Sequence, residues 1–343
     1  MGRRRSAAAQ PRQPLPSQAM SAAAAAAAPG GSEALQAEAF QRLYPDQYLA
    51  KFVAQGVRPD GRPLALPRAT SIGLGVVTTA DASALVKIGS TTVLAGAKCE
   101  VMPASADEPD KGRLVVQVEM APLCSAECRP GRPSEAAQAL GEQLGALMEG
   151  AGVVDRRQLC IDAGKAAWAV YLDLYVLDAD GSLYDACLLA ALATLASLRL
   201  HAVTVDDAGR IHKAGEDGAA AAPAAVAQQR PGSQQQGAAP PLRSLQLDCQ
   251  PVSLTCGVYR GQLLVDPTAE EEPLLEALLT ATVDEQGDVL GFYKAGGSAT
   301  ASQQRVLECI EAAKMRGKEV RGLLQQALEA AGVADGGAVA AGS

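Results

Sequence analysis

Apolar positions alternate with polar ones, or form short unbroken runs, in four segments after residue 69, and this pattern predicts β-strands. We expect these strands at 70–77, 83–89, 91–101 and 113–120. The second and third are joined through the tripeptide Gly-Ser-Thr, which is typical of a hairpin turn. The first part of the chain is therefore expected to be rich in β-structure.

The order of elements starts again in the second half of the chain. Helical spacing predicts a helix at 134–150, after which a long strand at 166–178 and a buried helix at 186–198 complete the first half. After residue 250 the pattern predicts four strands in two hairpins and a final helix, at 251–259, 262–267, 278–284, 289–297 and 301–331. Sheets with helices covering one side indicate an α+β fold, made here of two similar halves.

Two stretches lack this periodicity. Residues 1–32 are rich in arginine and alanine, and residues 207–243 are rich in proline, glycine, glutamine and alanine. Neither can form a packed apolar face, so we expect a disordered tail and a disordered surface insertion. The folded domain is then expected at 33–206 and 244–331, followed by a disordered C-terminal tail at 332–343.

The folded part of the chain is acidic and poor in aromatic residues. The net charge is −8, and because residues 1–32 hold four arginines and no acid, the remainder has 26 basic against 38 acidic residues. With aromatic residues at 3 %, it lacks the broad positive surface and the stacking platforms of an autonomous nucleic-acid-binding protein. If RNA is a partner, other proteins must help to hold it.

Composition also argues against metal, triad and membrane-spanning functions. Cys124 and Cys128 are the only closely spaced cysteines, and the only histidines, His201 and His212, lie far from them in the sequence. The sequence therefore brings together neither the four ligands of a zinc site nor the residues of a Ser-His-Asp triad. Eight scattered cysteines indicate a reducing compartment. The longest apolar run, 186–198, is shorter than the ~20 residues needed to cross a bilayer.

Five stretches, in a fixed order, resemble RNase PH-type subunits of the RNA exosome. They read "RPDGRP", "DASALVKIGSTTVLAGAKCEV", "DEPDKGRLVVQVEMAPLCS", "GKAAWAVYLDLYVLDADGSLYDACLLAAL" and "LLVDPTAEEE", and the likeness covers most of 40–325. The resemblance implies an RNase PH-like α+β fold with two similar β-rich halves and covering helices. It implies no cofactor and no metal for this chain.

Positions that match the phosphate and RNA sites of active members carry other residues here. The Gly-Thr-Arg or Gly-Ser-Arg phosphate loop corresponds to Ser182, Leu183 and Tyr184, so a phenol replaces the guanidinium that would clamp a phosphate. The arginines that grip RNA correspond to Gln138 and Glu142. Taken by itself, the stretch "DGSLYD" is also typical of a hairpin turn.

The carboxylate pair of active members is two aspartates six residues apart, and Asp266 matches the first of them. Glu272 replaces the second, and its extra methylene moves the carboxylate by about 1 Å, enough to weaken a preorganised site. The stretch "DPTAEEE" also fits a turn followed by a solvated acidic edge. Arg129 and Arg132 are the basic residues that remain near the expected path of RNA.

The resemblance therefore implies a catalytically inactive, structural subunit of an exosome ring that forms the channel for 3′-to-5′ RNA processing and degradation, including rRNA maturation and mRNA turnover. It implies other RNase PH-like ring subunits as neighbours, cap subunits with S1 and KH domains, and a separate hydrolytic nuclease. The expected location is the nucleus, nucleolus and cytoplasm. Two alternatives stay open: an active phosphate-dependent 3′-exoribonuclease, and a metal-dependent hydrolase that uses the carboxylate cluster.

Overall fold

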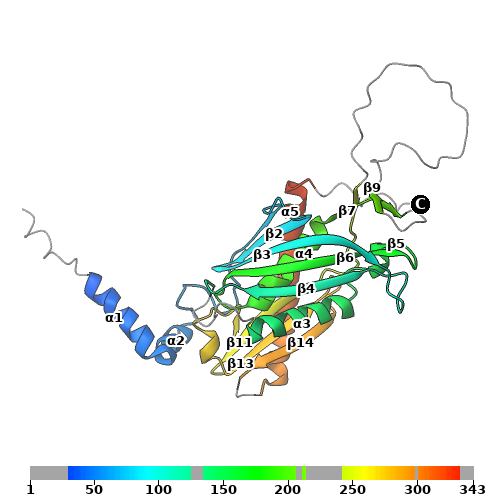
Figure 1. The fold of residues 1–343 in the computed structure, drawn as a ribbon. Helices are drawn as coiled ribbons and strands as arrows, with labels where there is room; N and C mark the ends of the chain where they lie inside the picture. The colour runs from blue at the N-terminus through cyan, green and yellow to red at the C-terminus, as the bar shows by residue number, and fades with distance from the viewer. Residues whose placement is uncertain (1–29, 125–133, 206–210, 214–241, 298–299, 333–343) are drawn as a thin grey trace, which may run out of the picture. The chain divides into compact units, whose positions relative to one another are not determined.

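The chain consists of two compact units, residues 1–55 and 56–343, and each is described by itself. The computed structural model describes residues 30–124, 134–205, 211–213, 242–297 and 300–332 (Figure 1).

The first unit contains two short helices, α1 (Gly30–Leu43) and α2 (Pro45–Val53). Pro45 occupies the first turn of α2, where a missing backbone N–H costs nothing because that donor has no partner inside the helix. The rings of Tyr48 and Phe52 then lie on one face of α2, with their centroids 5.0 Å apart.

The larger unit begins with a six-stranded sheet whose strands run in the order β1-β2-β3-β6-β4, with β5 paired to β6. The strands are β1 (Thr70–Leu74), β2 (Ala82–Ile88), β3 (Thr91–Pro103), β4 (Arg113–Met120), β5 (Cys160–Asp162) and β6 (Ala166–Asp178). β4 pairs with β6 in parallel and the other pairs are antiparallel. Val86, Val93 and Val176 lie in register across β2, β3 and β6 and are fully buried, so one face of the sheet forms the core.

Two helices pack on this sheet (Figure 1). α4 (Leu183–Ser197) is apolar on all sides because it is enclosed on all sides, with Leu188, Leu192 and Leu195 almost completely buried. α3 (Glu135–Gly150) lies beside β4 and inserts Leu144 and Met148 into the same core. None of the helices in the described ranges is long and apolar enough to span a membrane.

A second, four-stranded antiparallel sheet has the order β12-β11-β13-β14. It consists of β11 (Val252–Tyr259), β12 (Gln262–Val265), β13 (Ala277–Val283) and β14 (Val289–Gly296). All eight residues of β11 are buried, because α4 and the long helix α5 (Gln303–Ala330) both pack against this strand. The elements agree with those predicted from the sequence to within a few residues, and the predicted α+β class is confirmed.

Short elements near the predicted insertion were not visible in the sequence pattern. β7 (Arg199–His201) pairs with β10 (Leu242–Ser244), and β8 (Val203–Val205) pairs with β9 (Ile211–Lys213). Strand β9 therefore lies inside the range 207–243 that was predicted to be disordered. The rest of that range, the terminal tails and the pair Arg129 and Arg132 lie largely or wholly outside the described residues.

Candidate functional site

The loop between β6 and α4 meets the segment that follows β12. Gly181 and Ser182 both have positive φ, of 76° and 49°, and Ser182 is the N-cap of α4. A Cβ at Gly181 would lie 2.4 Å from the carbonyl oxygen of Pro267, so only glycine allows the two segments to approach this closely. The "DGSLYD" stretch is thus a strand-to-helix turn, and its interpretation as a hairpin turn was wrong.

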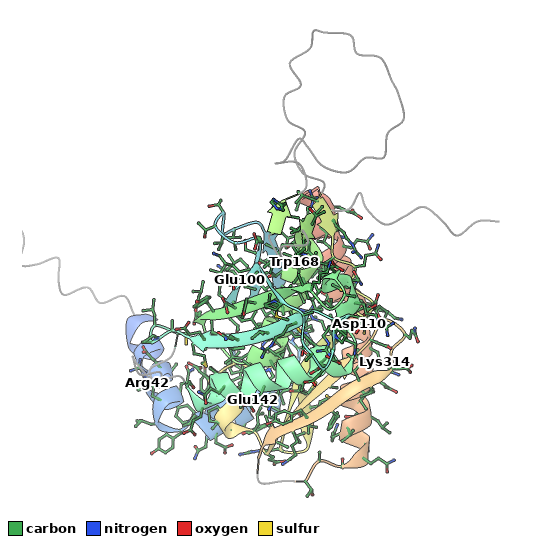
Figure 2. All side chains as sticks on the ribbon, turned by 45° about the vertical axis from the view of Figure 1, so that its right-hand side comes forward. Arg42, Glu100, Asp110, Glu142, Trp168 and Lys314 are labelled. Carbon is green, nitrogen blue, oxygen red and sulfur yellow. The ribbon has the colours of Figure 1, made fainter. Side chains whose placement is uncertain are left out.

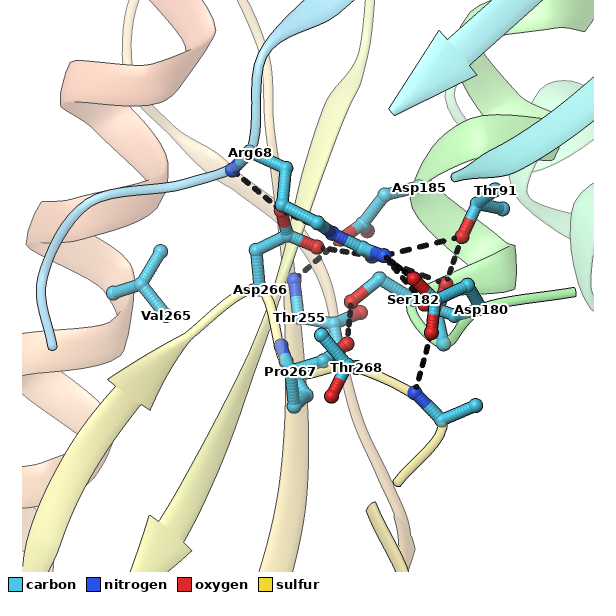
Figure 3. Close-up of polar contacts among 12 residues, drawn as sticks. Arg68, Thr91, Asp180, Ser182, Asp185, Thr255, Val265, Asp266, Pro267 and Thr268 are labelled. Carbon is cyan, nitrogen blue, oxygen red and sulfur yellow. Dashed lines mark hydrogen bonds and ion pairs between the residues drawn. The ribbon is translucent and has the colours of Figure 1, made fainter. Parts of the chain in front are cut away.

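Asp266 is the centre of the contacts in this region, and it is paired with an arginine (Figure 3). Its side chain is 3 % exposed, and the guanidinium of Arg68 donates from Nη2 to Oδ1 at 2.7 Å and from Nε to Oδ2 at 3.0 Å. The backbone N–H of Arg68 donates to Oδ2 as well, at 2.7 Å. Burial raises the pKa of Asp266, but the hydrogen bonds and charge of Arg68 outweigh burial and hold this pKa below its usual value.

Arg68 also binds the loop that precedes α4. Its guanidinium contacts the carboxylate of Asp180 at 3.2 Å and the carbonyl oxygen of Gly181 at 3.3 Å. The hydroxyl of Thr91 donates to the same carbonyl oxygen at 2.9 Å. One buried cation therefore connects Asp266 to the β6–α4 loop, and burial, which lowers the pKa of Arg68, is outweighed by Asp266, which raises it.

Glu272 binds the N-terminal end of α4. Its Oε1 accepts a hydrogen bond of 2.8 Å from the backbone N–H of Ser182, the N-cap residue. The backbone N–H groups at the start of a helix form a natural anion site, because they point at the ligand and the helix dipole favours negative charge. Burial raises the pKa of Glu272, and the bond from Ser182 and the charge of Arg68 reduce that rise. A carboxylate of the chain itself thus occupies this anion site.

Glu271 lies in a second buried ion pair. Its carboxylate accepts from Arg58 Nε at 3.0 Å, and Arg58 is completely buried. Arg58 Nη2 also donates to the backbone carbonyl of Asp266 at 3.1 Å. The prediction of a solvated edge for the successive glutamates was therefore wrong for Glu271, which is buried, whereas Glu270 is exposed.

Tyr184 and Leu183 are half-buried at the start of α4. Both pack against the main core, and burial raises the pKa of the Tyr184 hydroxyl to about 12, while a hydrogen bond with Thr282 opposes the rise. A phenol in this position cannot act as a cation or as a base near neutral pH. Tyr184 therefore contributes packing at the start of α4.

Gln138 and Glu142 belong to a different surface. Both are exposed on α3 and line a groove between α3 and β4, together with Arg113 and Gln117. Figure 2 labels Glu142 on this helix. Neither Asp266 nor any neighbour of it lines this groove. In the described part of the chain, no group of three or more histidine, cysteine, aspartate or glutamate side chains is placed to hold a metal ion.

The two arginines that neutralise the acidic segment were missed by the sequence reasoning. Arg58 is the first residue of the turn "RPDGRP" and Arg68 follows that turn, and each is separated from its carboxylate partner by about two hundred residues. No local pattern in the sequence marks either arginine as buried, because arginine is rarely buried unless it is paired and these partners lie far along the chain.

Comparisons with known proteins give consistent matches. The family model "3′ exoribonuclease family, domain 1" of the RNase PH type matches residues 67–201, and the model for domain 2 matches residues 249–316. The exosome complex component rrp43 of Schizosaccharomyces pombe is 30 % identical over 279 residues, which cover 81 % of this chain and 94 % of that protein. Rrp42 of Aeropyrum pernix is 33 % identical over 258 residues, covering 74 % and 84 %.

Solved structures show the same fold. A chain from the Archaeoglobus fulgidus exosome with RNA bound to the active site is 26 % identical, with a TM-score of 0.64, covering 81 % of this chain and 96 % of that chain. Rice Rrp46 matches with a TM-score of 0.54 and 17 % identity, covering 79 % of this chain and 100 % of that chain, which supports the fold alone.

Proposed function

Because the chain belongs to the RNase PH-type 3′ exoribonuclease family, and is similar over most of its length to exosome core subunits, we propose that it is a non-catalytic subunit of an RNA exosome ring. In this role the subunit contributes its surface to the RNA channel and to its neighbours, while other components cleave the RNA. It supports 3′-to-5′ processing and degradation, including rRNA maturation and mRNA turnover.

The single observation that carries the proposal is the internal occupation of the anion site. Phosphorolysis brings inorganic phosphate to the 3′-terminal phosphodiester, so a site needs free donors for a dianion and a free acid or metal for the leaving oxygen. Here Glu272 takes the N–H of Ser182, and Arg68 takes both carboxylate oxygens of Asp266. Phosphate would have to displace the half-buried carboxylate of Glu272, and the buried carboxylate of Asp266 would repel it.

The remaining substitutions support the same conclusion. Tyr184 places a half-buried phenol where active relatives are expected to present a guanidinium, and Gln138 and Glu142 place an amide and an anion where arginines are expected. Each change removes a positive charge from the expected path of phosphate or RNA. The acidic composition of residues 33–343 acts in the same direction.

Exposed sheet edges support a role through interfaces. β4 and β14 each end a sheet, and among the described residues neither pairs with a further strand on its outer side. β14 also exposes between 40 % and 46 % of three apolar or aromatic side chains, Val289, Phe292 and Tyr293. Unpaired edges of this kind are usually covered in a functional assembly. We assign this cover to RNase PH-like neighbours, which pair with the chain as a heterodimer within a hexameric ring.

A phosphorolysis assay distinguishes this proposal from the alternative of an active exoribonuclease. We expect the purified protein, incubated with single-stranded RNA, inorganic phosphate and Mg²⁺, to release no nucleoside diphosphates, and no monophosphates when phosphate is omitted. Asp266→Asn and the milder Glu272→Gln serve as matched variants, because they report whether any trace of activity belongs to this chain. Phosphorolysis that either variant abolishes would establish the active enzyme.

Assembly is tested by purifying the tagged protein from its own cells and identifying the proteins that accompany it. We expect other RNase PH-like subunits, S1 and KH cap subunits and a hydrolytic nuclease, the first two in near-equal amounts. The same tag should report the protein in the nucleus, nucleolus and cytoplasm. Recovery of a monomer without RNase PH-like companions would contradict the ring assignment.

A further inference from the structure

The long strand β6 divides its side chains between the two faces of the six-stranded sheet. Four alternate residues are fully buried in the core that they share with α4: Val170, Leu172, Leu174 and Val176. The residues between them point to the opposite face, because side chains alternate along a strand. Tyr171 and Asp173 are half-buried on that face, and Tyr175 is 42 % exposed. We call the surface formed by these three residues and their neighbours on β2, β3 and β4 the outer face.

The outer face carries many aromatic and aliphatic side chains. The strand register places Leu94 of β3 beside Tyr175, and Leu85 of β2 beside Leu94, so that these residues form one row across the sheet. Val115 of β4 lies beside Tyr171 in a second row. The helices packed on these strands, α3 and α4, insert their apolar residues into the core on the other side. An apolar sheet face that is left open in this way is typical of a surface that contacts another protein.

Two carboxylates lie among these apolar side chains, and no cation neutralises them. Glu119 of β4 lies beside Tyr175 and accepts a hydrogen bond from its hydroxyl. Asp173 lies one row away, beside Gln117 of β4. Burial raises the pKa of Asp173, and the negative charge of Glu119 raises it further. Among the described residues no basic side chain forms an ion pair with either carboxylate, and Lys98, in the next row, is exposed and pairs with neither.

The charge and shape of the outer face select the chemistry of its occupant. Like charges on neighbouring strands repel each other, so a cation placed between Glu119 and Asp173 would relieve this repulsion, whereas the phosphates of RNA would increase it. Small ligands usually bind in concave pockets, while an open sheet face offers area to a protein. Of the two basic side chains, arginine fits better than lysine, because its flat guanidinium can donate to two carboxylates and also stack on tyrosine rings.

We propose that the outer face is the docking site for an arginine-bearing segment of another protein in the assembly. The guanidinium binds between Glu119 and Asp173, and the apolar part of the segment packs on Tyr171, Tyr175 and Leu94. This inference rests on the proposed role in an exosome ring, and it adds the surface and the chemistry of one contact. The contact is separate from pairing at the edges β4 and β14, because it uses the side chains of a sheet face and needs no backbone hydrogen bonds between strands.

A photo-cross-link from position 117 identifies the occupant. Gln117 is exposed and lies beside Asp173, so replacing it by p-benzoylphenylalanine places a reactive group at the proposed site and leaves both carboxylates intact. We expect irradiation of the purified native assembly to attach a peptide of another subunit, and mass spectrometry to find an arginine within a few residues of the linked position. A cross-link to RNA, a cross-link to a segment without arginine, or no cross-link at all would overturn the proposal.

Matched charge variants test the part played by the two carboxylates. In the cross-linking protein we expect Glu119→Gln combined with Asp173→Asn to lower the yield of this cross-link several-fold, because the guanidinium loses both of its charged partners. The control, Glu311→Gln combined with Glu329→Gln, removes the same charge from exposed positions of α5 and should leave the yield unchanged. Equal yields in the two double variants would contradict the proposed site.

The two proposals fail in different ways. If the tagged protein recovers no RNase PH-like companions, the ring assignment is wrong. If those companions are present but position 117 forms no cross-link to an arginine-bearing segment, only the docking site on the outer face is wrong.

Discussion

Replacing Arg68 by methionine is the most informative perturbation, because it removes the charge while keeping most of the apolar volume. The variant loses two side-chain bonds to Asp266, of 2.7 and 3.0 Å, and the contacts with Asp180 and Gly181. Asp266 is 2 % exposed, so it would be left as a buried anion whose remaining ion pair, with Arg62 Nη1, is longer, at 3.7 Å.

The expected cost follows from the burial of the pair. Removing one partner of a buried ion pair typically costs about 3–5 kcal/mol, because the other charge loses its compensation. The backbone N–H of the residue at position 68 still donates to the carboxylate, which places Arg68→Met toward the lower end of this range. A loss of about 3–4 kcal/mol is a large share of the roughly 5–15 kcal/mol that stabilises a typical domain.

Pulse proteolysis across a urea gradient, at low protein concentration, measures this loss as a shift of the midpoint at unchanged slope. Arg157→Met is the control, because it removes the same side chain from an exposed pair with Asp110 and should cost under about 1 kcal/mol. In a double-mutant cycle with Asp266→Asn we expect a coupling energy of roughly 2 kcal/mol. If Arg68→Met costs no more than Arg157→Met, the pair does not hold the two segments together.

The pH dependence of stability gives an independent check on the direction in which the pKa of Asp266 is shifted. In the unmodified protein the pKa of Asp266 is lowered, so the pair contributes its full stability above the unfolded pKa of about 3.9 and loses it as the pH falls through the folded value. In Arg68→Met the carboxyl keeps its burial but loses the closer of its two cations, with Arg62 Nη1 left 3.7 Å from Oδ2, so its pKa rises. The difference in stability between the two proteins should therefore shrink as the pH falls from 7 toward 4.

Three further predictions rest on separate features. Gly181→Ala should lower the melting temperature by many degrees, because its Cβ would meet Pro267. Gly164→Ala has a similar φ but nothing within 4 Å of the new Cβ, so it should cost only the backbone strain. Equal losses of melting temperature in the two variants would argue against the close contact. Burial raises the pKa of Asp185 to about 6, so the free energy of unfolding should fall by about 3 kcal/mol as the pH rises from 4 through 6. Denaturation curves at several pH values measure this slope, and Asp185→Asn should abolish it. Replacing residues 214–241 by a short Gly-Ser bridge should leave the melting temperature nearly unchanged, since a surface loop costs little to shorten. A drop of many degrees would show that this segment packs against the folded domain.

Long periodic elements could be predicted from the sequence because their signal is local. β6 was predicted at its observed limits, and α5 within two residues, since alternation and helical spacing report which side chains must be buried on one face. β7 to β10 were missed because three residues cannot show a period, and their pairing depends on partners elsewhere in the chain. The family could be predicted for the same reason as the long elements, because its motifs are contiguous.

The candidate site was predictable only in part. The sequence by itself identified Asp266 and Glu272 as two carboxylates six residues apart, and it showed Tyr184 at the position where the resemblance implies an arginine. It could not show that Arg68 and the N–H of Ser182 take these carboxylates, because each contact joins residues that are 90 or more positions apart. Such pairing is decided by the packing of two domains around a shared buried junction, where an unpaired charge would be too costly to leave, and packing of this kind exists only in the tertiary structure.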